Sequence, residues 1–185
     1  MAKDLKLFMV MLGCKPEGRY TEQHDIFFGI GESLKELLPQ MNEFWPEAKG
    51  QIHIDAWREV RHVDGYSITI EERRHVPDPH QLFFINLGGY KENEFEEYHY
   101  KILTVTKSKA DAIKNSKESA FYKHCGFEGA PSHIDDKYGV DVDDIYTIEE
   151  ILPTSVKQMY QLSYTKSSEQ LEDELHIGYL KINNL

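Results

Sequence analysis

The sequence predicts an α+β fold: an internal duplication of a ββαββ unit that forms mixed sheets with one helix per repeat, followed by a C-terminal β-hairpin. The stretch that begins at Leu7 recurs from Leu82 at a constant offset of 75, which grows to 80 in the second half of the repeat. A self-alignment at a fixed offset is typical of a repeated structural unit. It divides the chain into a first repeat (1–75), a second repeat (76–152) and an extension (153–185), with the repeats packed as one compact pseudo-twofold unit.

Each repeat opens with two strands. Short apolar runs that end at a glycine, typical of buried strands, cover Leu7–Leu12 and Leu82–Leu87. The next strands are predicted over Glu22–Ile30 and Glu97–Val105. Because the two copies give the same order of elements, each supports the assignment of the other.

A helix follows in each repeat. Ser33 and Glu36 have the spacing of a capping box, in which the hydroxyl and the carboxylate each bind a free backbone amide. Pro39 lacks an amide hydrogen, so this helix should kink or begin late. The second helix contains no proline and is predicted over Ser108–Cys125, ending at Gly126.

Two further strands close each repeat, and the extension adds a hairpin. The first repeat should end with strands over Gln51–Val60 and Tyr66–Glu71, and the second with strands over Ser132–Val140 and Ile145–Ile151. In the extension, apolar and polar residues alternate on both sides of a polar turn at Lys166–Glu174. Such alternation predicts two half-buried strands, which would cover an exposed sheet edge.

The composition is that of an ordinary globular protein. The chain has 185 residues, of which 40% are apolar, and a net charge of −11. This charge argues against nucleic-acid partners, which bind clustered Lys and Arg. No apolar run is long enough to cross a bilayer, and the short apolar N-terminus matches the start of the second repeat, which indicates a strand rather than an export signal. We therefore expect a cytoplasmic protein with no membrane partner and with free thiols at Cys14 and Cys125, and its aromatic content is compatible with a homodimer.

Two pairs of polar residues predict a metal site. A strand, a helix and a further strand in succession indicate that the second and third strands run parallel. Glu22 and His24 open the second strand, and His53 and Asp55 open the third, so both pairs should lie at the same end of the sheet. Two imidazoles and two carboxylates suit a divalent transition metal such as zinc, iron or manganese. The corresponding residues of the second repeat are Glu97, His99, His133 and Asp135.

The same residues also fit a polar network without a metal. Polar pairs at strand starts commonly hydrogen-bond to loop backbone or occupy the solvated face of a sheet. The apolar residues Ile54 and Ala56 should lie on the buried face of the third strand. His53, Asp55 and Trp57 should then lie on the opposite face. On this interpretation, residues shared by both copies serve the scaffold.

Residues found in only one copy are the better candidates for binding a specific ligand, because the shared fold does not require them. The loop from Cys14 to Tyr20 and the Trp57-Arg58 pair differ between the copies. Loops on a rigid scaffold commonly carry function. The candidate ligand-binding residues are Cys14, Lys15, Arg19, Glu22, His24, Trp57 and Arg58.

Three stretches of the first repeat carry a resemblance to a known family: Leu7–Lys15, Thr21–Gly29 and His53–Arg58. They resemble the bacterial family called domain of unknown function 1543, in which the domain can occur in tandem. The resemblance implies a bacterial protein with two tandem copies, and it covers the second copy more loosely, as far as Leu152. It implies no reaction, cofactor or catalytic residue.

The sequence therefore favours a non-catalytic module that binds a small ligand or a protein partner on a duplicated scaffold, without a cofactor. The alternative is a metal-dependent, hydrolase-like enzyme that uses Glu22, His24, His53 and Asp55, with a divalent transition metal as its cofactor. The chain contains no phosphate loop and no nucleophile elbow that would point to another class of enzyme.

Overall fold

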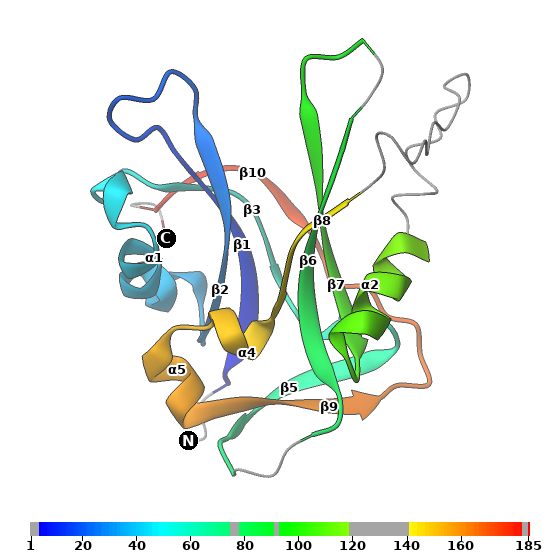
Figure 1. Cartoon of the computed structure of the whole chain (residues 1–185). Helices are drawn as coiled ribbons and strands as arrows, with labels where there is room; N and C mark the ends of the chain where they lie inside the picture. The colour runs from blue at the N-terminus through cyan, green and yellow to red at the C-terminus, as the bar shows by residue number, and fades with distance from the viewer. Residues whose placement is uncertain (1–3, 75–77, 91–92, 119–140, 183–184) are drawn as a thin grey trace. The chain divides into compact units, whose positions relative to one another are not determined.

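The computed structural model describes residues 4–74, 78–90, 93–118, 141–182 and 185 (Figure 1). The chain divides into two compact units: the first contains residues 1–76 and 151–185, and the second contains residues 77–150. Over the described residues, ten strands form three sheets, accompanied by short helices. The mixed α+β class predicted from the sequence is thus observed, and the extension belongs with the first unit.

The first unit is built around a four-stranded sheet in the order β10–β3–β1–β2. Its strands are β1 (Lys6–Cys14), β2 (Gln23–Gly31), β3 (His53–Glu59) and β10 (His176–Lys181). β2 and β3 each pair antiparallel with β1, so they run parallel to one another, which confirms that prediction. They are not neighbours, however. Because β1 lies between them, side chains of β2 and β3 can meet only across β1.

Short helices cover one face of this sheet. η1 (Leu34–Leu37) is a 3₁₀ turn, α1 (Leu38–Phe44) follows it, and η2 (Pro46–Ala48) ends the segment. The α-helix begins late, with Pro39 in its first turn, where the missing amide would have had no intrahelical partner. The predicted hydroxyl cap is absent: the amide of Glu36 donates to the backbone oxygen of Ser33 (3.2 Å) and closes the 3₁₀ turn instead.

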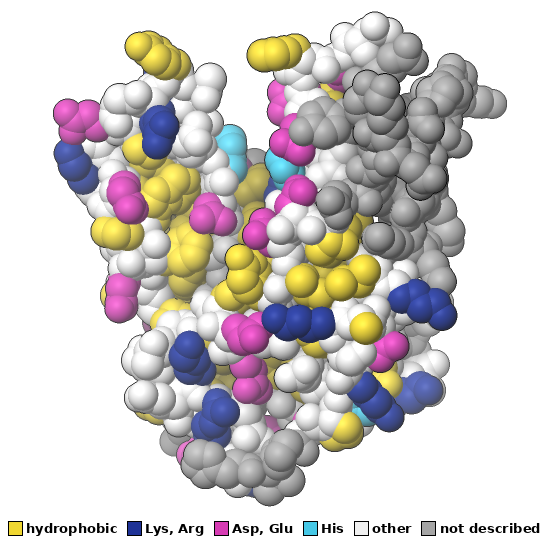
Figure 2. Space-filling view, viewed as in Figure 1, with side chains coloured by type: hydrophobic (Ala, Val, Ile, Leu, Met, Phe, Trp, Pro, Cys, Tyr) yellow, Lys and Arg dark blue, Asp and Glu magenta, His cyan; other side chains and the backbone are white. Residues whose placement is uncertain are grey.

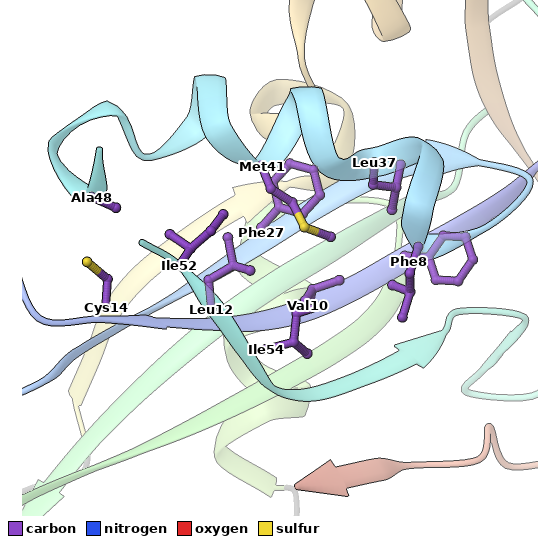
Figure 3. Packing of buried hydrophobic residues seen from close by; sticks show 11 residues of the cluster. Phe8, Val10, Leu12, Cys14, Phe27, Leu37, Met41, Ala48, Ile52 and Ile54 are labelled. Atoms are coloured by element: carbon purple, nitrogen blue, oxygen red, sulfur yellow. The ribbon is translucent and has the colours of Figure 1, made fainter. Parts of the chain in front are cut away.

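The core of the first unit lies between this helical segment and the sheet (Figure 3). Alternate residues of β1 face the helices and contribute to the core, so residues 7, 9, 11 and 13 face the other side of the sheet. Burying each large side chain contributes about 1.5–3 kcal/mol. The buried cluster consists of Phe8, Val10, Leu12, Cys14, Phe27, Leu34, Leu37, Met41, Ala48, Ile52 and Ile54.

A β-bulge in β3 reverses the alternation predicted from the sequence. Asp55 is an extra residue between two stretches of regular pairing with β1. Beyond it, Trp57 lies opposite Val10 and packs against the helix-side core. The prediction that Trp57 shares a sheet face with His53 is therefore wrong, because simple alternation does not allow for an inserted residue.

The C-terminal extension does not form the predicted hairpin. After α5 (Thr154–Met159), β9 (Tyr160–Lys166) pairs with β5 (Tyr66–Glu72) in a separate sheet that also contains β4 (His62–Val63). β10 instead pairs with β3 and forms one edge of the four-stranded sheet. The alternation of apolar and polar residues identified both strands of the extension, but it does not show which strands they pair with. No tight turn joins β9 to β10.

The second unit contains a three-stranded sheet in the order β7–β6–β8. Its strands are β6 (Gln81–Tyr90), β7 (Glu97–Thr106) and β8 (Asp141–Thr147), and both outer strands pair antiparallel with β6. The sheet contributes Phe83, Ile85 and Leu87 to a small core, to which a helix adds Ala112.

That helix, α2 (Lys109–Glu118), begins with a hydroxyl cap, since the Ser108 hydroxyl accepts a hydrogen bond from the Asp111 amide (3.1 Å). Its predicted continuation, the predicted strand over 132–140 and the residues Cys125, His133 and Asp135 lie outside the described residues. None of the helices in the described ranges is both long and apolar enough to span a membrane.

The strand predicted over Ile145–Ile151 is correct as far as Thr147 and wrong beyond it. Its first residues complete β8, and the rest form the helix α4 (Ile148–Ile151). Thr147 and Glu150 make a capping box: the Thr147 amide donates to the Glu150 carboxylate (2.8 Å), and the Glu150 amide donates to the Thr147 hydroxyl (3.3 Å). This Thr-x-x-Glu spacing is a helix signal that outweighs the apolar character of the segment.

Candidate metal centre

Four side chains that can bind a metal meet at one end of the first unit's four-stranded sheet. Nε2 of His53 lies 3.1 Å from Oε1 of Glu22 and 3.3 Å from Oδ2 of Asp55. Nε2 of His24 lies 3.3 Å from the same Asp55 oxygen and 3.7 Å from Oε2 of Glu22. We call Glu22, His24, His53 and Asp55 the first-unit cluster.

Gly13 on the central strand allows the two flanking strands to bring these side chains together. It lies opposite His24 of β2 and opposite His53 of β3. A Cβ atom at residue 13 would lie 2.3 Å from Nε2 of His53 and 2.5 Å from Oδ2 of Asp55, closer than non-bonded atoms approach. The imidazole and the carboxylate therefore occupy space above β1 that the side chain of any other residue would fill.

The two carboxylates come from irregular backbone beside these strands. Glu22 directly precedes β2, and Asp55 is the inserted residue of the bulge in β3. Bulges often re-aim a side chain next to a functional site. The cluster is thus assembled from a strand entry, a regular strand and a bulge, all held by pairing with β1.

The cluster is closed on one side and open on the other. His53 is 8% exposed, whereas the side chains of His24 and Glu22 remain 45% and 47% exposed. The ring of Tyr179 on β10 packs against the His53 ring at a centroid distance of 4.6 Å. In the space-filling view, histidine side chains are visible from solvent close to carboxylates (Figure 2). Because the side chains of His24 and Glu22 are exposed, a small molecule can approach the cluster from their side.

Two atoms of the cluster, Nε2 of His53 and Oδ2 of Asp55, are buried without a hydrogen-bond partner among the described residues. Their close contacts are not aligned as hydrogen bonds, and an unsatisfied buried polar atom costs about 1–3 kcal/mol. Around a metal ion with bonds of about 2.0–2.2 Å, neighbouring donor atoms lie about 3.0–3.5 Å apart. Three of the four distances in the first-unit cluster fall in that range. No three of these residues offer donor atoms that all lie within 4.8 Å of one another, so small side-chain rotations would be needed to bring all the donors around one ion.

Cys14 is close to the cluster in sequence but lies in the core on the helix side of the sheet. It is 1% exposed, and burial, followed by the negative charge of Glu22, raises the pKa of its thiol. Because the thiolate is the form that attacks substrates and binds metals, a buried protonated thiol does neither. Cys14 is a core residue.

The remaining candidates for ligand binding are dispersed. Lys15 and Arg19 are exposed in the loop between β1 and β2. Trp57 lies on the helix side and stacks on His176 at a centroid distance of 3.8 Å. Arg58 is half-buried against the sulfur of Met9.

Arg58 also differs from the others in charge environment. Burial lowers the pKa of its guanidinium, and the negative charge of Asp173 partly offsets that effect. Of the seven candidate residues, the structure brings together Glu22 and His24, in the first-unit cluster, while the other five lie in the core, in the loop or farther along β3.

A related group of side chains lies in the second unit. Nε2 of His99 lies 3.3 Å from Oδ2 of Asp143 and 3.9 Å from Oε2 of Glu97. We call Glu97, His99 and Asp143 the second-unit cluster. The repeat offset of 80 predicts His133 and Asp135 as the matching residues, because the motif recurs there in the sequence, and both lie outside the described residues. The register of β8 against β6 identifies Asp143, and the repeated motif does not encode that register.

Comparison with known proteins supports the family resemblance for one copy. Residues 19–70 match the model of a family described as Domain of Unknown Function (DUF1543), and this range contains the whole first-unit cluster. The chain is also similar to the crystal structure of a protein Il1583 from Idiomarina loihiensis, with 24% sequence identity, a TM-score of 0.65, and coverage of 97% of this chain and 99% of that one. At this identity the likeness shows a shared fold. No curated protein matches the chain.

Proposed function

We propose that this protein binds a divalent transition-metal ion in the first-unit cluster and presents it to a small molecule. The observation that carries the proposal is the pair of buried atoms without hydrogen bonds, Nε2 of His53 and Oδ2 of Asp55, which lie 3.3 Å apart. A bound cation would satisfy both atoms at once. It would also neutralise the two carboxylates that face the same space.

The donor set favours zinc, iron or manganese. Two imidazoles suit transition metals of borderline softness, and the carboxylates of Glu22 and Asp55 add two negative charges without a thiolate. Cys14, the thiol nearest in sequence, lies in the core on the helix side of the sheet. We use zinc as the probe ion below because it has no preferred coordination geometry of its own.

The open side of the cluster supports a role beyond structure. A structural zinc site is normally closed by four protein ligands in a buried tetrahedron, whereas an ion beside the exposed His24 and Glu22 would remain accessible to water. An accessible ion lowers the pKa of bound water and polarises a carbonyl or phosphoryl group. Metal-dependent, hydrolase-like chemistry on a small substrate is the reaction class that fits this arrangement.

We also infer that the two units descend from one duplicated unit. Gly13 of β1 and Gly88 of β6 hold the same register position, each opposite a histidine of the next strand. β3 and β8 carry a register shift at corresponding positions of their pairing. On this basis the third strands correspond at an offset of 88, which makes Asp143, rather than Asp135, the counterpart of Asp55.

Zinc binding tests the proposed function. Protein purified without an affinity tag is stripped of metal with a chelator, and the zinc affinity is measured by competition with a chromophoric chelator. We expect His53→Gln to lower the affinity of the tightest site at least about 100-fold, since it removes a buried ligand. Glu22→Gln removes an exposed ligand and should lower the affinity without disturbing the core.

His62→Gln is the matched control, because it removes another partly buried imidazole of the first unit outside the cluster. It should leave the zinc affinity unchanged. Equal zinc affinities for the wild type, His53→Gln and Glu22→Gln would overturn the proposal. So would wild-type protein that retains less than about a tenth of an equivalent of zinc in the presence of excess ion.

A further inference from the structure

We infer that the second-unit cluster is a separate divalent-cation site, with a harder donor set that suits Mn²⁺. One donor atom from each of Glu97, His99 and Asp143 lies within 4.8 Å of the others. The imidazole is held between the two carboxylates, 3.3 Å from Oδ2 of Asp143 and 3.9 Å from Oε2 of Glu97. This site goes beyond the function proposed for the first unit, because it uses none of the same residues.

A glycine creates space for this cluster, as in the first unit. Gly88 lies opposite His99, and a Cβ atom at residue 88 would lie 2.3 Å from Oδ2 of Asp143. The Asp143 carboxylate is therefore folded over the backbone of β6 toward His99. Glycine in the middle of a strand destabilises it by about 0.5–1 kcal/mol relative to alanine. Its presence here is explained if the carboxylate has to reach that position.

The third strand of the second unit has no histidine where β3 has His53, so the second-unit cluster has fewer imidazole donors. In register, the residue of β3 that lies opposite Gly13 is His53, and the residue of β8 that lies opposite Gly88 is Asp141. The second-unit cluster thus contains one imidazole and two carboxylates. Carboxylate oxygens suit Mg²⁺, Ca²⁺ and Mn²⁺, and Mn²⁺ among these also accepts imidazole readily.

The surroundings of the second-unit cluster are polar. On the same strands, Asn86 donates to Asp144 (3.5 Å), and the Tyr146 hydroxyl donates to the other oxygen of Asp144 (3.3 Å). The register positions of Asn86 and Asp144 are taken in the first unit by Met11 and Ala56. Mg²⁺ bound by a few carboxylates usually keeps several waters, Mn²⁺ shares its octahedral oxygen geometry, and polar neighbours of this kind can bind such waters.

Electron paramagnetic resonance of Mn²⁺ tests the inference on the full chain, because the six-line signal of the hydrated ion is lost on binding. We expect Asp143→Asn to lower the Mn²⁺ affinity at least about 10-fold and Glu97→Gln to do the same, while zinc binding at the first-unit cluster is unchanged. Both residues are exposed, so neither substitution should prevent folding. Glu96→Gln, which removes the neighbouring exposed carboxylate, is the matched control and should bind Mn²⁺ as the wild type does.

The outcomes separate the two sites. His53→Gln should abolish tight zinc binding but leave Mn²⁺ binding intact, so failure of the first-unit proposal alone would leave the Mn²⁺ result standing. Equal Mn²⁺ affinities for the wild type, Asp143→Asn and Glu97→Gln would overturn the inference. A loss in Glu96→Gln as large as in Asp143→Asn would also overturn it, since it would indicate diffuse attraction to acidic side chains.

Discussion

The two clusters have the same position in their sheets and differ in what the third strand supplies. In both units a glycine of the central strand lies under the cluster, and a Glu-x-His pair enters from the second strand. β3 then adds His53 and Asp55, whereas β8 adds Asp143. The comparison indicates that the first two strands set the geometry of a cluster and that the third strand sets its donor set.

The clusters also differ in burial. His53 is 8% exposed, whereas the side chain of Asp143 is 33% exposed. Water can solvate exposed donors when no ion is present, but buried donors without partners retain the full desolvation penalty. We therefore expect the first-unit cluster to bind its ion more tightly than the second.

The largest effect is expected from Gly13→Ala. The added methyl group would overlap the His53 ring and the Asp55 carboxylate, which are held in place by packing. We expect the zinc affinity to fall at least about 100-fold and the free energy of unfolding to fall by about 1–3 kcal/mol from overpacking. Chelator competition and urea denaturation measure the two quantities.

Gly88→Ala is the matched variant in the second unit. Its methyl group would meet the carboxylate of Asp143, which is exposed and can rotate away. The Mn²⁺ affinity should fall about 10-fold, with a smaller loss of stability than in Gly13→Ala. Equal losses of stability in both variants would contradict the difference in burial between the clusters.

Zinc should stabilise the folded protein by an amount comparable to the loss of stability expected in Gly13→Ala. At a free zinc concentration of 100 times the Kd, binding to the folded state should raise the free energy of unfolding by about 2.7 kcal/mol. The increment should vanish in His53→Gln and persist in Asp143→Asn. Calorimetric or urea unfolding with and without zinc measures it, and an increment that survives in His53→Gln would place the stabilising ion elsewhere.

Smaller effects are expected from two carboxylates, one in each unit, that should make the free energy of unfolding depend on pH in opposite directions. Burial raises the pKa of Asp173, although the amides of Arg61 and His62 donate to it, so its contribution to stability is lost as the pH rises through its folded-state pKa. The hydrogen bond from the Thr147 amide lowers the pKa of Glu150, so its contribution is lost as the pH falls through its folded-state pKa.

Asp173→Asn and Glu150→Gln should remove these dependences. Each variant should differ from the wild type by about 0.5 kcal/mol, the size of a cap or of an exposed charge interaction. For Asp173 the stability of the wild type relative to the variant should fall with rising pH, and for Glu150 it should rise. Urea denaturation across the acidic range measures both differences, and two profiles of the same sign would contradict this account.

The smallest effect is expected from Lys101→Gln. The Lys101 ammonium donates to the backbone oxygen of His99 (3.1 Å), which places a positive charge beside the second-unit cluster, where β2 of the first unit has Ile26. Removing that charge should raise the Mn²⁺ affinity about 2–5-fold at low salt, and the gain should shrink at high salt. A reduced affinity would instead show that Lys101 supports the cluster.

Much of the first-unit cluster could be predicted from the sequence, because it depends on local patterns. The strand–helix–strand order predicted that β2 and β3 run parallel, and the spacing of Glu22, His24, His53 and Asp55 placed all four residues at one end. The position of β1 between those strands could not be predicted, since it depends on pairing. The importance of Gly13 follows from that pairing.

The remaining features depend on inserted residues and on strand partners. The bulge at Asp55 turned Trp57 to the helix side, and a bulge leaves no mark in simple alternation. The His-Ile-Asp motif at 133–135 repeats that at 53–55, but it does not reveal Asp143, whose position depends on the pairing of β8 with β6. The strands of the extension were identified by their alternation, but their partners, β5 and β3, are distant in sequence.

We propose that the first-unit cluster binds a metal ion, and an anomalous difference map at the zinc absorption edge tests this proposal most directly. In crystals of the zinc-loaded protein, the map should contain a peak about 2.0–2.2 Å from donor atoms of His24, His53 and Asp55, with Glu22 on the open side. The peak should be absent in His53→Gln. Zinc-loaded crystals with no peak between these residues, or with a peak of equal height in His53→Gln, would contradict the claim.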